Sequence, residues 1–369
     1  MHEMAKKTAL HDRHVALGGR MVDFGGWRLP VQYEGVLAEH RHCRAAAVVF
    51  DTSHMGQFML RGSDAAGRLG LIGTQDAEAL RVGRCRYGFL LNEDAGVLDD
   101  TILMRLGADE LLLVVNAGRA ETDLRWIEGH LRGDVELVDL SAAGWGKVDL
   151  QGADSAKVLA GLADVDPAGM AYFGVARGQC CGRACLISRT GYTGELGYEI
   201  MAAGDDLRTI FDELLSSPAV RPAGLGARDS LRLEMGYPLY GHELTEDRNP
   251  IEAGLAAFAV PDRPFIGSDR LRVLAETAPA RRLVAYRAES RRRTNPGNEI
   301  RCDGRAVGAV TSGAFSPSLG VSIGMGYVEA PFAEAGRQLA VDTGRCELAV
   351  VVCDRPLYRG GTCRTNDPL

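Results

Sequence analysis

A helical repeat of apolar positions is clearest in residues 31–47. Five of its residues can share one stripe at helical spacing: Val36, Leu37, His40, Cys43 and Ala47. The apolar run 47–50 follows without a break, and a short run of this kind is typical of a buried strand. This part of the chain therefore predicts an amphipathic helix that leads directly into a strand.

Strand and helix patterns then alternate along the chain. Apolar runs predict strands at 57–60, 87–91, 97–104, 110–116, 147–150, 184–188 and 198–202. Helical spacing marks residues 64–71, 119–131, 155–162, 205–215 and 268–277. The alternation indicates a mixed α+β fold, and its two similar passages leave open a distant internal duplication without visible sequence identity.

The pattern changes after Pro279. The remaining chain consists of short apolar runs separated by glycine and polar turns, among them RLVAYRA, AVGAVTSG, SIGMGYV and CELAVVV. Regular short strands with turn signals indicate an all-β sandwich or barrel. We therefore expect a domain boundary near Pro279.

The predicted strand 97–104 contains two adjacent aspartates. Because side chains alternate between the faces of a strand, Asp100 falls on a face whose other side chains are apolar, and Asp99 falls on the opposite face. An unpaired buried carboxylate costs on the order of several kcal/mol, so Asp100 needs partners or a proton. We expect Asp99 to be an ordinary solvated or capping carboxylate, and Asp100 to be either a strand cap or a functional acid.

The segment SRTGYTGELGYE, residues 188–199, is rich in glycine and also carries bulky and charged side chains. Glycine permits positive φ and a close approach of the backbone. One interpretation is a decorated hairpin turn. The other is a loop that presents Tyr192 and the carboxylate of Glu195 to a flat heterocycle with adjacent N–H donors.

The segment RPAGLGARDSLRLE, residues 221–234, is a glycine-rich entry into a helix. Arg228 lies in its first turn, where a cation opposes the helix dipole, so a contact outside the helix is expected. A salt bridge to a neighbouring acid is the simpler explanation and a ligand the other. Asp229 and Arg232 have the i,i+3 spacing of an ion pair.

Composition excludes several classes of protein. The 369 residues carry a net charge of −7 and no basic run beyond Arg291–Arg293, which argues against nucleic acid as a partner. No apolar run approaches the roughly 20 residues of a membrane span, and no signal peptide is evident, so we expect a cytoplasmic protein. The nine cysteines are irregularly placed, without a C-x-x-C pair, and reduced thiols are expected.

Histidine offers little evidence for a metal. The pairs His11/His14 and His40/His42 lack a third ligand at a useful spacing, and we expect no metal site. His54 follows a predicted strand and is open to a structural or a catalytic interpretation. Phosphate-binding, dinucleotide-binding and serine-hydrolase motifs are absent from the sequence.

Taken together, these stretches resemble the T-protein (aminomethyltransferase) family of the glycine cleavage system. The segments that carry the resemblance occur in order and nearly from end to end: FDTSHMG, LLNEDAGVLDDTI, SRTGYTGELGYE, RPAGLGARDSLRLE, NPIEAGL, TSGAFSPSLG and PLYRG.

The resemblance implies a three-domain α+β folate-binding fold with a C-terminal all-β barrel or jelly-roll-like domain. The expected domains are 1–52 with 140–278, which binds folate, 53–139, which carries the catalytic aspartate, and 280–369. The implied reaction moves the carbon of an aminomethyl group from the dihydrolipoyl sulfur of a lipoylated H-protein to tetrahydrofolate, with release of ammonia. No metal is implied, and a monomer is expected.

The same resemblance assigns site residues. Asp100 matches the catalytic aspartate beside the folate N10, and a carboxylate on an apolar face is suited to stabilise a cationic intermediate. Glu195 matches the carboxylate that pairs with the pterin ring. The other expected folate contacts are Tyr87, Asn116, Tyr192, Arg228, Tyr358 and Arg359.

Two positions depart from the family pattern, and two rival functions remain. Phe258 stands near an expected tryptophan and Phe173 where a second tyrosine is common. The rivals are a tetrahydrofolate-dependent demethylase of the same fold and a non-catalytic folate-binding paralogue, whose lysine-glycine-cysteine motif is absent here. An arginine rim formed by Arg81, Arg84 and Arg86 is a candidate docking surface for an acidic carrier.

Overall fold

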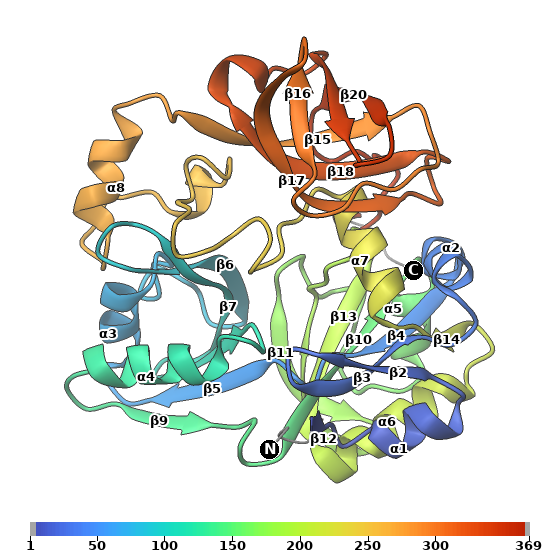
Figure 1. The fold of residues 1–369 in the computed structure, drawn as a ribbon. Coiled ribbons are helices and arrows are strands. Elements are labelled where there is room, and N and C mark those ends of the chain that lie inside the picture. The colour runs from blue at the N-terminus through green and yellow to red at the C-terminus, as the bar shows by residue number, and fades with distance from the viewer. Residues whose placement is uncertain (1–4, 366–369) are drawn as a thin grey trace. The chain divides into compact units, whose positions relative to one another are not determined.

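The computed structural model describes residues 5–365, and the chain divides into two compact units. The first unit comprises Met1–Gly88, Thr101–Arg228 and Gly361–Leu369, and the second comprises Phe89–Asp100 and Asp229–Gly360. Each unit therefore combines segments that lie far apart in the sequence (Figure 1).

A six-stranded sheet forms the centre of the first unit, with the order β11-β12-β13-β10-β4-β14. Its strands are β4 (Ala47–Asp51), β10 (Trp145–Gln151), β11 (Val175–Cys180), β12 (Arg183–Ser188), β13 (Gly197–Ala203) and β14 (Val220–Pro222). The helices α2 (Val36–Ala45), α5 (Ser155–Ala160) and α6 (Gly204–Ser216) pack against it (Figure 1). Strand β10 is antiparallel to both of its neighbours, β4 and β13.

One face of this sheet is covered by apolar packing. Helix α6 repeats apolar residues at helical spacing, and all of them are buried in one core: Leu207, Ile210, Phe211 and Leu214. The strands contribute every second residue to the same core, among them Val148, Leu150 and Ile200. The residues between them must then point to the opposite face.

A second sheet, with the order β6-β7-β8-β5-β9, belongs mostly to the first unit. Its strands are β5 (Gly56–Arg61), β6 (Arg84–Leu91), β7 (Val97–Gly107), β8 (Glu110–Val115) and β9 (Glu136–Asp139), with helices α3 (Ala65–Ile72) and α4 (Ala120–His130). Met59, Met104 and Leu112 of this sheet share a core with Leu186 and Met201 of the six-stranded sheet. Part of the face opposite α6 is therefore covered by a second layer.

The N-terminal part adds a three-stranded sheet of order β1-β3-β2. Its elements are β1 (Lys6–Lys7), β2 (Arg20–Phe24), β3 (Trp27–Gln32) and the helix α1 (His11–Ala16). The hairpin between β2 and β3 turns at Gly25 and Gly26, which both have positive φ. The sequence pattern predicted a helix from residue 31, but 31 and 32 belong to β3, and Gly35 (φ 119°) separates that strand from α2.

The second unit contains a closed six-stranded barrel of order β15-β18-β17-β16-β19-β20. Its strands are β15 (Arg281–Ala288), β16 (Glu299–Cys302), β17 (Arg305–Phe315), β18 (Ser322–Glu329), β19 (Gln338–Asp342) and β20 (Glu347–Cys353). The unit also contains α8 (Ser268–Ala275) and the 3-10 turns η1 (Ala256–Phe258) and η2 (Ala330–Phe332). Helix α7 (Leu225–Glu234) begins in the first unit and ends in the second.

The predicted fold class is confirmed. The structure is a mixed α+β fold, and of the two all-β architectures that the C-terminal pattern allowed, it has the closed barrel. Within residues 5–365 no helix is long and apolar enough to cross a membrane.

Helix α6 gives a direct test of the first unit's core. Leu207 is fully buried, so Leu207→Ala should lower the free energy of unfolding by about 2–5 kcal/mol, since it leaves a cavity under the sheet. Leu71, on α3, is 44% exposed, and Leu71→Ala is the matched control that should cost far less. Urea denaturation followed by circular dichroism measures both, and equal losses would contradict this account of the core.

Candidate functional site

Strand alternation gives β10 two different faces. Val148 and Leu150 point into the core with α6. Lys147, Asp149 and Gln151 therefore share the opposite face, and all three are buried. A buried polar side chain needs hydrogen-bond partners, and each of these three has them.

Asp149 is the centre of an ion cluster on this face. Its Oδ1 accepts hydrogen bonds from Lys147 Nζ at 2.8 Å and from Thr52 Oγ1 at 2.7 Å. Its Oδ2 accepts a hydrogen bond from Arg228 Nη1 at 2.7 Å. Glu199 of β13 lies opposite Asp149 in the antiparallel register, and its Oε2 is 3.1 Å from Lys147 Nζ.

Burial and charge act in opposite directions on the two carboxylates. Burial raises the pKa of Asp149, but the charges of Lys147 and Arg228 outweigh it and hold that pKa below its usual value. Burial also acts on Glu199, and there it prevails: the pKa of Glu199 is raised although Lys147 opposes the shift. Asp149 is therefore the firmly ionised partner, and the charge of Glu199 depends on its neighbours.

Arg228 lies between a carboxylate and aromatic rings. Its guanidinium carbon is 5.0 Å from the centre of the Tyr192 ring and 5.9 Å from that of Phe50. The salt bridge expected for Arg228 is confirmed, with Asp149 of β10 as the partner. The predicted pair of Asp229 and Arg232 also forms, at 2.9 Å, within the second unit.

His54 lies near the same cluster as a neutral imidazole. Burial lowers the pKa of His54 to about 4, and the positive charges of Arg228 and Lys147 contribute to the shift. The ring meets Phe24 edge to face, with 5.9 Å between ring centres. At neutral pH His54 therefore carries no charge, whichever of its two interpretations applies.

Gln151 shapes the glycine-rich loop that carries Tyr192. Its Nε2 donates a hydrogen bond to Thr190 O at 3.1 Å, and its Oε1 accepts one from Thr193 Oγ1 at 2.9 Å. A Cβ at Gly191 or Gly197 would lie 2.0 or 2.3 Å from atoms of the Gln151 side chain. These two glycines are therefore required by the close approach of the loop to Gln151.

Glu195 has its carboxylate occupied by the protein. Its Oε1 accepts a hydrogen bond from Arg44 Nη1 at 2.7 Å. Its Oε2 accepts hydrogen bonds from Thr362 Oγ1 at 2.5 Å and Thr362 N at 3.2 Å. The side chain is 2% exposed, so these contacts fasten the segment that follows Gly361 to the loop of the first unit.

The two aspartates of β7 have the opposite exposure to the one predicted. Asp99 is fully buried, so the expectation of an ordinary solvated carboxylate is wrong, and Asp100 is half-buried. Asp99 shares its face of β7 with Val97, Thr101 and Leu103, which are all buried as well, and the Thr101 hydroxyl accepts a hydrogen bond from Gln75 Nε2 at 2.7 Å. The face that carries Asp99 is therefore the buried one along this part of β7.

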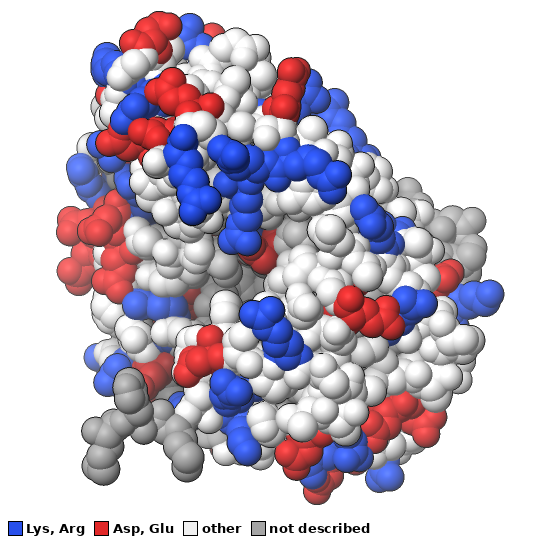
Figure 2. Space-filling model, turned by 45° about the vertical axis from the view of Figure 1, so that its right-hand side comes forward, with Lys and Arg blue, Asp and Glu red and all other residues white. Residues whose placement is uncertain are grey.

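The remaining predicted contacts of the first unit lie on or just beyond strands. Tyr87 is half-buried on β6, and Asn116 is half-buried directly after β8. In the proposed arginine rim, Arg81 and Arg86 are exposed, but Arg84 donates a hydrogen bond to Tyr172 O at 2.9 Å. On the face shown in Figure 2, basic side chains are interspersed with acidic ones.

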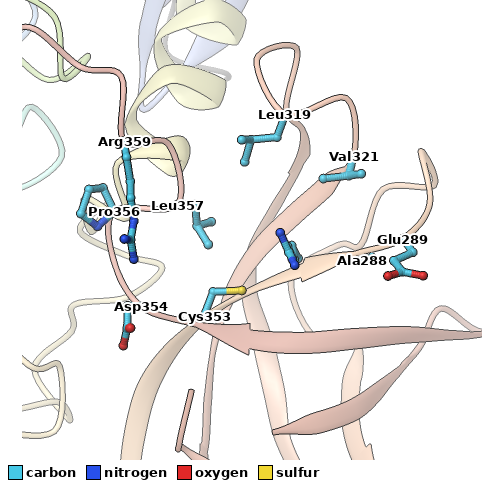
Figure 3. A pocket seen from close by; sticks show the side chains of 10 residues that line it. Ala288, Glu289, Leu319, Val321, Cys353, Asp354, Pro356, Leu357 and Arg359 are labelled. Carbon is cyan, nitrogen blue, oxygen red and sulfur yellow. The ribbon is translucent and has the colours of Figure 1, made fainter. Parts of the chain in front are cut away.

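Tyr358 and Arg359 belong to the second unit. Tyr358 N donates a hydrogen bond to Glu234 O, and Arg359 is one wall of a cavity of about 470 Å³ beside the barrel. Figure 3 shows the side chains around this cavity, which also include Leu319, Cys353 and Leu357. The cavity combines apolar walls with both signs of charge.

The two departures from the family pattern have different settings. Phe173 has a positive φ of 60° and packs edge to face on Tyr172, with 4.9 Å between ring centres. Phe258 is 45% exposed on η1.

The histidine pairs are not arranged as metal ligands. His14 is held by Asp51 Oδ2 at 2.8 Å from Nε2 and by Tyr33 Oη at 2.8 Å from Nδ1. Among residues 5–365 no group of three or more His, Cys, Asp or Glu side chains is arranged to hold a metal ion.

The sequence motifs do not single out four of these side chains: Lys147, Asp149, Gln151 and Glu199. The run KVDLQ reads as a strand because of its apolar residues, but its other residues alternate strictly with them. A charged or amide side chain at every second position of a central strand is the signal that indicates a polar site on one face.

Comparison with known proteins covers nearly the whole chain. Residues 10–262 match the family model of the GCVT N-terminal domain, and residues 281–359 match that of the glycine cleavage T-protein C-terminal barrel domain. The aminomethyltransferase of Herpetosiphon aurantiacus is 41% identical over 357 residues, which are 96% of this chain and 98% of that protein. The aminomethyltransferase of Geobacillus kaustophilus is 40% identical over 363 residues, 96% of this chain and 99% of that protein.

A solved structure agrees with these matches. The glycine cleavage system aminomethyltransferase T from Bartonella henselae has a TM-score of 0.90 and 34% sequence identity, and the match covers 97% of this chain and 99% of that one. This chain therefore belongs to the glycine cleavage T-protein family, the aminomethyltransferases of the glycine cleavage system.

Proposed function

We propose that this aminomethyltransferase takes its one-carbon unit from the aminomethyl-dihydrolipoyl arm of a lipoylated H-protein and delivers it to tetrahydrofolate, with release of ammonia. The observation that carries the proposal is the contact of Tyr192 and Arg228 above the buried Asp149. It offers a flat aromatic and cationic surface that Asp149 joins to the six-stranded sheet, which suits a planar heterocycle. Bound tetrahydrofolate would supply the nitrogens that accept the carbon.

The ring needs an acceptor as well as a flat surface. Adjacent N–H donors of a pterin are matched by the two oxygens of a carboxylate. Glu199 supports this role because it lies within the cluster of Lys147, Asp149 and Arg228 and keeps 10% of its side chain exposed. We propose Glu199 as the ring carboxylate.

Glu195 is the competing candidate. The family resemblance assigns it to the pterin, but in this structure Arg44 and Thr362 already occupy its two oxygens. A ring donor would have to displace one of these contacts at a cost, since a buried hydrogen-bonding group left without a partner is unfavourable. The role of Glu195 therefore stays a prediction, and the structure supports Glu199 better.

Asp100 is the proposed catalytic residue. Its partial exposure on β7 fits a carboxylate that must meet the substrate, where it orients the folate N10 and stabilises a cationic one-carbon intermediate. Tyr87, Asn116, Tyr358 and Arg359 are the further folate contacts that we propose. For the H-protein, Arg81 and Arg86 remain exposed basic side chains that suit an acidic surface.

The activity itself has a decisive assay. Aminomethylated H-protein is incubated with the enzyme with and without tetrahydrofolate, and ammonia and methylene-tetrahydrofolate are measured. Ammonia release that depends on tetrahydrofolate supports the proposal. A demethylase would leave this substrate unchanged, and a binding protein would release nothing.

Asp100→Asn tests the catalytic role. We expect kcat to fall by about 10²–10³-fold, because the neutral amide no longer stabilises developing positive charge, while tetrahydrofolate affinity is retained. Asp94→Asn is the control, since Asp94 is exposed in the same segment. Turnover of Asp100→Asn equal to that of the control would remove Asp100 from the mechanism.

Glu199→Gln and Glu195→Gln distinguish the two candidate carboxylates. We expect Glu199→Gln to weaken tetrahydrofolate binding by about tenfold or more, because an amide replaces one acceptor oxygen by a donor. Glu195→Gln should lower thermal stability and leave affinity within about threefold, since its contacts are internal. Calorimetric titration and thermal denaturation measure both, and the reverse pattern would restore the assignment of Glu195.

A further inference from the structure

Lys147 is an unusual residue for its position. Its side chain is 1% exposed, on a central strand, and lysine is almost never buried unless it is paired. Its ammonium lies 2.8 Å from Asp149 Oδ1 and 3.1 Å from Glu199 Oε2. The family assignment gives it no role.

The geometry shows what Lys147 does to its neighbours. Asp149 bridges Lys147 and Arg228 through different oxygens, so both cations are fixed by one carboxylate. Lys147 in turn contacts Glu199, the residue across the strand from Asp149. The four side chains are formally neutral as a group, two cations with two carboxylates, and loss of one cation would leave an uncompensated negative charge.

The protonation state of Glu199 is the property most sensitive to that loss. An ionised carboxylate only accepts hydrogen bonds, whereas the protonated acid donates one and loses an acceptor position. Only the ionised form can meet two adjacent N–H donors of a pterin. A cation in contact with Glu199 is therefore needed to keep a buried carboxylate as an acceptor.

We propose that Lys147 is a positioning residue for folate binding, which holds Glu199 in its ionised form and in place to receive the ring. The proposal rests on the proposed function, in which Glu199 contacts the pterin. Asp149 has a supporting part, because it fixes the ammonium of Lys147 and the guanidinium of Arg228 at the same time.

The sign of the pH effect follows from the groups that face Glu199. On β10 these are Lys147 and Asp149, on α7 Arg228, and on β6 Cys85, whose pKa is raised by burial so that the thiol stays neutral. Burial already raises the pKa of Glu199, and Lys147 opposes that shift. Without Lys147 the pKa of Glu199 rises further. Because the carboxylate is ionised only above its pKa, a falling pH then protonates Glu199 at a higher pH than in the parent.

The test is the affinity for tetrahydrofolate as a function of pH. Lys147→Met, the parent and Lys157→Met are titrated anaerobically by calorimetry between pH 6 and 9. Lys157 is exposed on α5 and is the matched control. We expect Lys147→Met to bind about tenfold more weakly than the parent at pH 7 and to recover most of the difference by pH 9, where Glu199 is ionised in both proteins.

A double variant separates positioning from general damage. Glu199→Gln removes the carboxylate that titrates. Adding Lys147→Met to this variant should therefore cause no further pH-dependent loss of tetrahydrofolate affinity. Lys147→Gln, which keeps a hydrogen-bond donor without the charge, replaces Lys147→Met if the latter fails to fold, and circular dichroism monitors folding.

The outcomes distinguish this inference from the proposed function. Parent-like affinity of Lys147→Met at every pH, or a loss independent of pH, overturns the role of Lys147. Parent-like affinity of Glu199→Gln overturns the ring assignment itself. A pH-dependent loss in Lys147→Met that disappears in the double variant supports both.

Discussion

The contact on which the site depends is the carboxylate of Asp149 between two cations. Its two oxygens are bound by Lys147 of the same strand and by Arg228 of α7, at the polar face of the six-stranded sheet. A buried carboxylate is tolerated only when its attraction to fixed cations offsets the loss of water, and here it has two cations and the Thr52 hydroxyl. The same contact holds Arg228 beside the Tyr192 ring, so the flat surface of the site is a consequence of how Asp149 is satisfied.

This arrangement is possible because the sheet separates two tasks by strand alternation. Every second residue of β10 and β13 packs against α6, which supplies stability without polar groups. The residues between them are free to be charged, because their partners come from the neighbouring strand, from α7 and from the loop that Gln151 organises. A site built on strands rather than on loops alone is positioned by the core beneath it.

Local patterns predicted the fold better than the site. Apolar periodicity was sufficient for α4, α6 and the short strands of the barrel, since each of these depends on neighbours in sequence. The start of α2 was predicted too early. Residues up to Gln32 pair with β2 as part of β3, and Gly35 at positive φ precedes the first residue of the helix. The exposure of Asp99 and Asp100 was reversed because the alternation of β7 separates its two faces but does not tell which of them is buried, and the face of Asp99 is the buried one.

Two glutamates of one segment show why residue type and motif do not settle a role. Glu195 and Glu199 are four residues apart, and both are buried carboxylates near the same glycine-rich loop. Glu195 lies in the loop, where Arg44 and Thr362 bind its oxygens, and it thereby holds the segment around Thr362. Glu199 lies on β13, where the strand directs it into the ion cluster with Lys147 as its one ion-pair partner among residues 5–365. A carboxylate whose oxygens are bound by the protein contributes to stability, and we propose the other one, which lies beside a lysine, as the carboxylate that meets the ring. The difference arises from contacts with residues distant in sequence, so the motif alone does not distinguish the two glutamates.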